Sequence, residues 1–187
     1  METAGLGRAL FVDRDGTLIP DLHYLGDPER VEVLRGVGEA LRVARAHGYQ
    51  VVCVTNQSGI GRGFYGQEDV EKVHARLNER LAREGARVDA FYYCPHLPEA
   101  GCACRKPNTE LFDRAQRDLH LDWARSAIVG DRWLDMEAGR RLGLLTAYVP
   151  AVGHEEESDR ELREHQFTSD IRAATLRSAT YRILSIG

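Results

Sequence analysis

Three of the chain's four cysteines lie close to one histidine in the stretch CPHLPEAGCACRKP. They form a Cys₃His set in two close pairs, made of Cys94, His96, Cys102 and Cys104. This set has the ligand number and type of a closed tetrahedral Zn²⁺ site, which leaves no position for a reacting water. The pattern therefore predicts a structural zinc site, and the alternatives are unliganded thiols or a disulfide.

Two carboxylates stand two residues apart in the stretch DRDGT, at Asp13 and Asp15. Because acids this close repel each other, the pair is stable only beside a cation or with one member protonated. Phosphoryl transfer through an aspartyl phosphate uses both conditions. Asp13 would then be the nucleophile and a ligand of Mg²⁺, while protonated Asp15 would donate to the leaving oxygen. A simple Asx turn is the structural alternative for one of the two acids.

Two further stretches offer polar groups of the same kind. In TNQSGIGRG, Thr55 supplies a hydroxyl for a phosphate oxygen, and the residues after it supply backbone amides. The candidate contacts in that loop are Asn56, Gln57 and Ser58. In GDRWLD, Asp131 can reach a cation shared with Asp13. Asp135 would orient a water ligand of that cation or Lys106, or would cap the helix that follows.

A basic pair directly follows the second pair of cysteines, at Arg105 and Lys106. A phosphate dianion approaching Asp13 would be repelled by that carboxylate, and Mg²⁺ together with the ammonium of Lys106 would offset the repulsion. A zinc site in the same loop would hold both basic residues in place. The alternative is an ordinary solvated Arg-Lys pair.

The elements that must position these residues are short β-rich runs that alternate with longer helical patterns. Strands are expected at residues 9–13, 49–55, 88–94, 126–131 and 145–149. Helices are expected at residues 36–47, 67–84, 109–119 and 134–142. This alternation predicts an α/β fold, with a parallel sheet covered by helices on both faces. The candidate residues follow the first four strands, at the edge where such folds bind ligands.

The chain is expected to form one domain over residues 1–152, with residues 153–187 packed on it. The tail opens with a dense run of charged residues at 153–166, the charge run, which is expected to be a solvated linker or an exposed helix. The stretch at 169–184 then predicts a closing helix. Its expected cap is Ser169 or Asp170, and its expected buried residues include Ile171, Ala174 and Ile183.

Composition bounds the functions that the chain can have. Its 187 residues are 43% hydrophobic and 29% charged, and its net charge of −4 makes it a poor nucleic-acid binder. Charges interrupt the N-terminal apolar run, so neither a signal peptide nor a membrane span is expected. We therefore expect a cytoplasmic protein whose partner is a small phosphorylated molecule, with no nucleic acid and no membrane. The oligomeric state stays open.

Together DRDGT, Thr55, Lys106 and GDRWLD resemble the haloacid dehalogenase (HAD) superfamily of phosphatases, over about residues 8–150. The CPH and CACRKP halves of the cluster are similar to its zinc-containing branch, which holds D-glycero-D-manno-heptose 1,7-bisphosphate phosphatases and histidinol-phosphate phosphatases. The resemblance implies a Rossmann-like domain in which Thr55 and Lys106 hold the phosphoryl group. It also implies Mg²⁺ bound by Asp13, the backbone carbonyl of Asp15, and Asp131.

Two parts of the sequence point to different substrates. DLHYLGDPERVEVLRG resembles the heptose bisphosphatases, which implies substrate contacts from Asp21 to Tyr24, Arg105 and Arg132, whereas the short LPEAG resembles the histidinol-phosphate branch. The main hypothesis is removal of the 7-phosphate of D-glycero-D-manno-heptose 1,7-bisphosphate. The alternatives are a histidinol-phosphate phosphatase, a polynucleotide 3′-phosphatase and a non-catalytic, zinc-stabilised phosphate-binding module. Residues 14–54 leave no room for a large cap domain, so an open site is expected.

Overall fold

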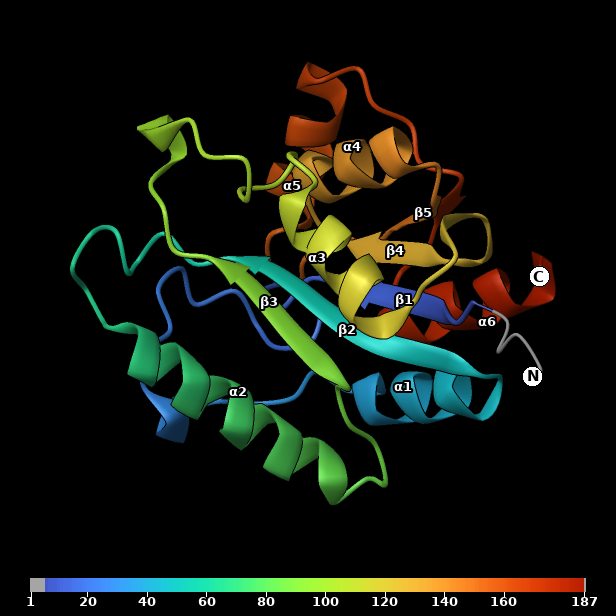
Figure 1. Cartoon of the computed structure of the whole chain (residues 1–187), viewed down its shortest axis with the longest axis horizontal. Coiled ribbons are helices and arrows are strands. Elements are labelled where there is room, and N and C mark those ends of the chain that lie inside the picture. The colour runs from blue at the N-terminus through green and yellow to red at the C-terminus, as the bar shows by residue number, and fades with distance from the viewer. Residues whose placement is uncertain (1–5, 187) are drawn as a thin grey trace.

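A computed structural model of the chain describes residues 6–186, which form a six-stranded parallel sheet in the order β3-β2-β1-β4-β5-β6 (Figure 1). The strands are β1 (Arg8–Val12), β2 (Tyr49–Asn56), β3 (Ala90–Cys94), β4 (Ala127–Gly130), β5 (Leu145–Tyr148) and β6 (Ile171–Arg172). The five expected strands are confirmed. The sixth is a short edge strand that was not expected.

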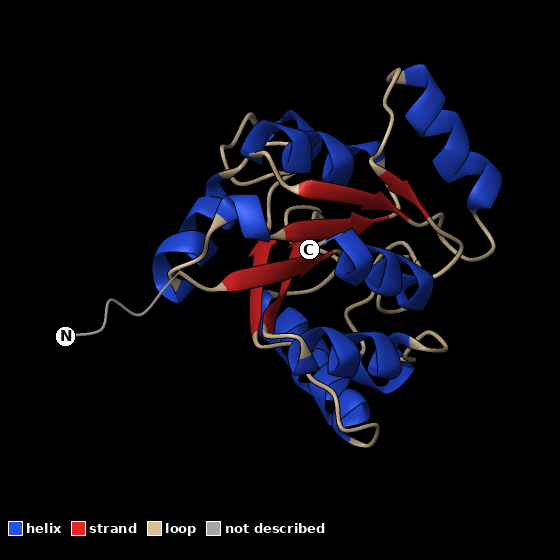
Figure 2. Ribbon diagram, turned by 90° about the vertical axis from the view of Figure 1, so that its right-hand side faces the viewer, coloured by secondary structure: helices blue, strands red, loops and turns tan. Residues whose placement is uncertain are grey.

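Helices cover both faces of this sheet (Figure 2). They are α1 (Val37–Ala46), α2 (Gln67–Ala82), α3 (Glu110–Leu119), α4 (Trp133–Leu142), α5 (Glu155–Glu164) and α6 (Leu176–Ile186). Residues of α1, α2 and α6 share one core cluster, and residues of α3 and α4 share the cluster on the opposite face. The α/β architecture is therefore the one that the alternating pattern predicted.

Strand β1 shows why its sequence is apolar at consecutive positions. Leu10 and Val12 are buried in the cluster of α1, α2 and α6. Ala9 and Phe11 are buried in the opposite cluster, where the ring of Phe11 lies 5.1 Å from that of Phe112 in α3. A strand covered on both faces has no solvated side, so both sets of side chains must be apolar.

The chain between β1 and β2 contains a loop, one turn of 3-10 helix at Pro28–Arg30, and α1. The described residues insert no further unit there. The expectation of a domain without a large cap is confirmed, and the carboxyl ends of β1 and β2 are left uncovered by any inserted unit.

The closing helix was predicted to begin too early. Ile171 belongs to β6 and pairs with Ala147 of β5, and α6 begins only at Leu176. Asp170 does not cap that helix, because its carboxylate accepts hydrogen bonds from the backbone N–H and the hydroxyl of Thr146. Pairing with the free edge of β5 satisfies backbone groups that a longer helix would have left unpaired.

The three residues that were expected to be buried in the closing helix can be compared with the structure. Ile171 and Ile183 are buried as expected, whereas Ala174 is exposed in the turn before α6. The dense charge run forms α5, one of its two predicted forms. The division of the chain at residue 152 remains a prediction. Among residues 6–186, no helix combines the length and apolar character that a bilayer crossing requires.

Candidate active site and cysteine cluster

A cavity of about 300 Å³ opens at the carboxyl edge of the sheet, where the loops after β2 and β3 leave on the same side (Figure 1). Most of the candidate residues line it. They are Asp13, Asp15, Asp21, Tyr24, Thr55, Asn56, Ser58, Arg105, Lys106, Arg132 and Asp135. Parallel strands deliver their polar ends to one edge, which explains why residues far apart in the sequence meet here.

Lys106 is buried at the floor of this cavity. Its Nζ lies 2.9 Å from Oδ1 of Asp13 and 2.6 Å from Oδ1 of Asp135, and it donates to the carbonyl of Val54 at 2.7 Å. Burial alone would lower the pKa of Lys106, but the two carboxylates outweigh burial and raise it. The ammonium is therefore fixed and charged beside the expected nucleophile.

Asp135 makes the contacts of two of the three roles considered for it, to Lys106 and to the start of α4. One carboxylate oxygen accepts from Lys106, and the other accepts from the backbone N–H of Arg132 at 3.2 Å, at the start of α4. Gly130 makes this possible, because a Cβ there would lie 2.4 Å from the carboxyl carbon of Asp135. The carboxylate of Asp135 therefore caps α4 and orients Lys106 at the same time.

Asp131 is buried, and among residues 6–186 its Oδ1 has no hydrogen-bond partner. Carboxylate oxygens of Asp13, Asp131 and Asp135 all lie within 4.8 Å of one another. Burial, together with Asp13 and Asp135, raises the pKa of Asp131 well above its usual value. Three clustered carboxylates with an orphan oxygen form a donor set that fits a hard divalent cation.

Asp15 is held by a network that the sequence did not reveal. Arg14 is fully buried, and its guanidinium donates to both carboxylate oxygens of Asp15 at 3.1 Å. Burial raises the pKa of Asp15, although Arg14 opposes this effect. Arg14 also donates to the side-chain oxygen of Gln57 at 2.8 Å. The only sequence sign of this role was a basic residue placed between two acids.

Gln57 departs from the predicted role of phosphate contact. It is buried and does not line the cavity. Its side-chain amide donates to Asp15 at 2.8 Å and to Thr55 at 2.9 Å, and its backbone N–H donates to the carbonyl of Cys94. Because these donors are already used, Gln57 positions Asp15 and Thr55 and offers no donor to a substrate.

Asn56, the last residue of β2, holds the backbone of Lys106 in the loop after β3. Its side-chain oxygen accepts from the backbone N–H of Lys106 at 3.0 Å, and its amide donates to the carbonyl of Lys106 at 3.3 Å. Arg132 also lines the cavity, and its guanidinium forms an ion pair with Glu161 of α5. The charge run thus reaches the rim of the site, a contact with no sign in the sequence.

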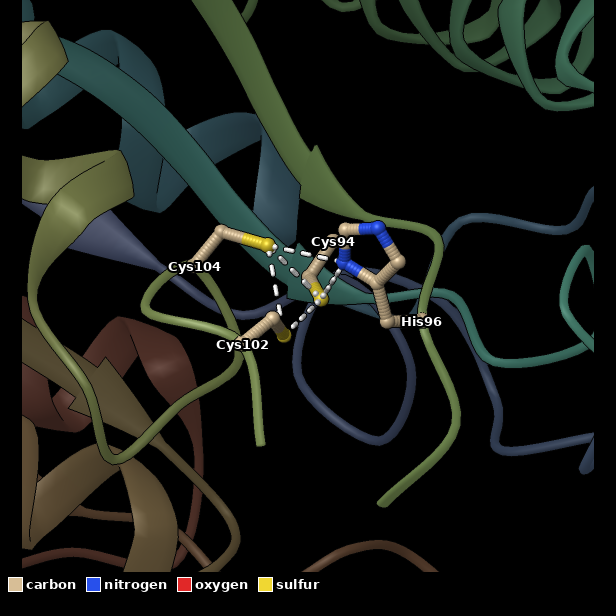
Figure 3. Close-up of side chains that lie close together, drawn as sticks. All are labelled: Cys94, His96, Cys102 and Cys104. Atoms are coloured by element: carbon tan, nitrogen blue, oxygen red, sulfur yellow. Dashed lines mark hydrogen bonds between the residues drawn. The ribbon is translucent and has the colours of Figure 1, made fainter. Parts of the chain in front are cut away.

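The cysteine cluster is assembled as its spacing predicted (Figure 3). The three sulfur atoms and Nδ1 of the histidine point to a common centre, with neighbouring ligand atoms 3.1–3.6 Å apart. A tetrahedral site with metal–sulfur bonds of about 2.3 Å has neighbouring sulfurs about 3.8 Å apart, so this set fits zinc with a small expansion. All four cysteines of the chain are free thiols.

The chain is similar to known phosphatases over most of its length. It is 41% identical over 133 residues to a D-glycero-beta-D-manno-heptose-1,7-bisphosphate 7-phosphatase of Helicobacter pylori, covering 71% of this chain and 77% of that protein. A D-glycero-alpha-D-manno-heptose-1,7-bisphosphate 7-phosphatase of Burkholderia mallei is 40% identical over 149 residues, covering 76% of this chain and 79% of the relative. The chain belongs to the heptose bisphosphatase family of the HAD superfamily.

Two further likenesses agree with membership in the heptose bisphosphatase family. The HAD-hydrolase-like family profile matches residues 103–179. A crystal structure of D,D-heptose 1,7-bisphosphate phosphatase from B. bronchiseptica, complexed with magnesium and phosphate, superposes with a TM-score of 0.85 and 27% identity. That superposition covers 96% of this chain and 99% of the other.

Proposed function

We propose that this chain is an Mg²⁺-dependent phosphomonoesterase that removes the 7-phosphate of D-glycero-D-manno-heptose 1,7-bisphosphate. The observation that carries the proposal is the cavity floor, where Asp13 lies 2.9 Å from a buried, charged Lys106. The names of the Helicobacter and Burkholderia relatives support this substrate and do not favour histidinol phosphate. All four expected charged residues of the site are present, so a non-catalytic binding module is not favoured either.

The proposed reaction has two steps. An oxygen of Asp13 attacks the phosphorus and forms an aspartyl phosphate, while the bond from phosphorus to the sugar oxygen breaks and Asp15 gives that oxygen a proton. Asp15 then takes a proton from a water whose oxygen attacks the same phosphorus. The bond from phosphorus to Asp13 breaks, which releases inorganic phosphate and restores both acids.

The surrounding residues prepare these steps. The raised pKa of Asp15 favours the protonated form that the first step needs. Thr55 and the backbone after it face the transferred phosphoryl group, and Lys106 offsets its negative charge. Asn56 and Asp135 keep Lys106 in place.

Two metal sites are part of the proposal. Asp13, Asp131 and the backbone carbonyl of Asp15 would hold Mg²⁺, which neutralises charge on the phosphoryl oxygens. The orphan oxygen and raised pKa of Asp131 support this site. The Cys₃His cluster would hold Zn²⁺ as structural support, because its four ligands leave no open position.

The test is phosphate release from both anomers of heptose 1,7-bisphosphate and from histidinol phosphate, measured side by side with Mg²⁺. We expect kcat/KM to be at least about tenfold higher for one heptose anomer than for histidinol phosphate. A preference for histidinol phosphate would overturn the proposed substrate, and failure to hydrolyse any of the three would overturn the proposed reaction. The anomer itself is left to this experiment, because the relatives' names include both.

The cytoplasmic location expected from the sequence remains a prediction.

A further inference from the structure

Four arginine and lysine side chains line the cavity, and they differ in whether a carboxylate already pairs with them. They are Arg62, Arg105, Lys106 and Arg132. Lys106 is paired with Asp13 and Asp135, and Arg132 is paired with Glu161. Within residues 6–186, the other two arginines have no carboxylate within ion-pair distance. The cavity therefore holds two cations free to meet an incoming anion.

One of these free cations, Arg62, lies in the loop after β2 and contacts the aromatic ring of Tyr24. Its guanidinium carbon is 5.7 Å from the centroid of the Tyr24 ring, within reach of a cation–π contact. The Tyr24 ring in turn packs edge-on against Phe64 at 4.9 Å. The side chain of Arg62 is exposed to solvent, so it is available to a ligand.

The backbone of this loop is tied to the exit of β3. The N–H of Gly61 donates to the carbonyl of Pro95 at 3.0 Å, and the N–H of Gln57 donates to the carbonyl of Cys94 at 2.7 Å. A Cβ at Gly61 would lie 3.0 Å from the Pro95 oxygen, so glycine allows this close approach. The loop that carries Arg62 is thereby fixed to the loop that carries Arg105.

The rest of the cavity makes such cations necessary for a doubly phosphorylated substrate. Four acids line it, at Asp13, Asp15, Asp21 and Asp135. Lys106 is already paired with Asp13 and Asp135, where the first phosphate would react, so a second phosphate needs other cations to bind it. Arginine suits this purpose, since its planar guanidinium binds phosphate with paired hydrogen bonds.

We propose that Arg62 joins Arg105, whose contact with the substrate the family resemblance already implies, in binding the phosphate that is not transferred, and so makes the site selective for a bisphosphate. This inference rests on the proposed function and specifies how its substrate is recognised. Arg62 touches only the distal phosphate and takes no part in the transfer at Asp13. Its loss should therefore act on the second phosphate alone.

The experiment compares kcat/KM for heptose 1,7-bisphosphate with that for 4-nitrophenyl phosphate, which has no second phosphate. Arg62→Ala should lower the value for the bisphosphate about 10- to 100-fold, mainly through KM, and change the value for 4-nitrophenyl phosphate less than about twofold. Arg62→Lys should recover part of the loss, because it keeps the charge without the paired hydrogen bonds.

Arg114→Ala is the matched control, since Arg114 is also exposed and lies over a tyrosine ring, 5.8 Å from the centroid of Tyr92, but does not line the cavity. It should leave both substrates unchanged. An equal fall on both substrates in Arg62→Ala, or no fall on either, would overturn the inference while the proposed function stands. An unmodified enzyme that releases no phosphate from the bisphosphate would overturn both.

Discussion

The acidic centre (Asp13, Asp131 and Asp135) and the cysteine cluster lie at the same edge of the sheet but differ in the donor atoms that they offer and in charge. The acidic centre has buried oxygen donors, a raised pKa at Asp131 and one carboxylate oxygen without a partner. The cysteine cluster has soft donors at the end of β3 and in the loop after it, and these donors lie around a single point. The first arrangement can bind a cation and still contact a substrate, whereas the second could hold one metal ion with no position left for a substrate.

This difference assigns separate roles to the two regions. A centre with an open position and unbalanced charge can bind a cation and a phosphoryl group. A closed cluster can only hold its own loop, and here that loop carries Arg105 and Lys106 to the cavity. Changes in the acidic centre should therefore lower kcat steeply. Changes in the cysteine cluster should instead loosen the positions of Arg105 and Lys106 and have a smaller effect on kcat/KM.

The largest effect is expected for Asp13→Asn. The change keeps the shape of the side chain but removes the nucleophile, so kcat for phosphate release should fall at least about 10³-fold. Circular dichroism should show an unchanged fold. Asp118→Asn is a control on the exposed surface of α3, and it should retain full activity. Measurable turnover near the unmodified rate in Asp13→Asn would contradict the role given to the acidic centre.

Lys106→Met should come next. It removes the fixed ammonium but keeps much of the buried chain, and kcat should fall about 10²- to 10³-fold. Asp13 and Asp135 would then face each other without a cation, so the variant should also unfold at a lower temperature. Activity measured beside thermal unfolding would test this, and an unchanged kcat would show that Lys106 is only structural.

Cys102→Ser addresses the cysteine cluster. We expect zinc content to fall below one per chain, the unfolding temperature to drop, and kcat/KM to fall about tenfold because Arg105 and Lys106 lose their support. The control is Cys53→Ala, at a buried cysteine outside the cluster. This variant should retain one zinc per chain. If Cys102→Ser lost activity as completely as Asp13→Asn, the distinction between chemistry and support would fail.

Stability should depend on pH through the acidic centre when Mg²⁺ is absent. Burial raises the pKa of Asp135 to about 6 and raises that of Asp131, so the folded protein holds protons that the unfolded chain releases. The free energy of unfolding should therefore decrease as pH rises from about 4 through 6, with each of the two acids contributing on the order of 1 kcal/mol per pH unit. Asp131→Asn should flatten this dependence in thermal unfolding across that range, and an unchanged slope would contradict it.

The smallest effect is expected for Glu161→Gln. It breaks a partly exposed ion pair with Arg132, so the free energy of unfolding should fall by no more than about 1 kcal/mol. Release of Arg132 toward the cavity should change KM for the bisphosphate only about twofold. A large loss of kcat would mean that α5 belongs to the catalytic centre and not to its rim.

The sequence predicted the parts whose signals are local. The buried strands were readable from apolar runs, the positions of Asp13 and Asp131 from the strand ends, and the cysteine cluster from its residue types and spacing. Arg14 was missed, because no local pattern distinguishes a buried arginine from an exposed one. Gln57 was misassigned and β6 was overlooked, since both depend on partners distant in the sequence, such as Asp15 and the edge of β5.

One measurement tests the division of roles most directly. Phosphate release from heptose 1,7-bisphosphate should be followed as Mg²⁺ is withdrawn by gel filtration into metal-free buffer and then restored, with zinc content measured at each stage. We predict that activity disappears and returns with Mg²⁺, while one zinc per chain is retained throughout. Activity that persists without Mg²⁺, or that follows the zinc content, would contradict this division.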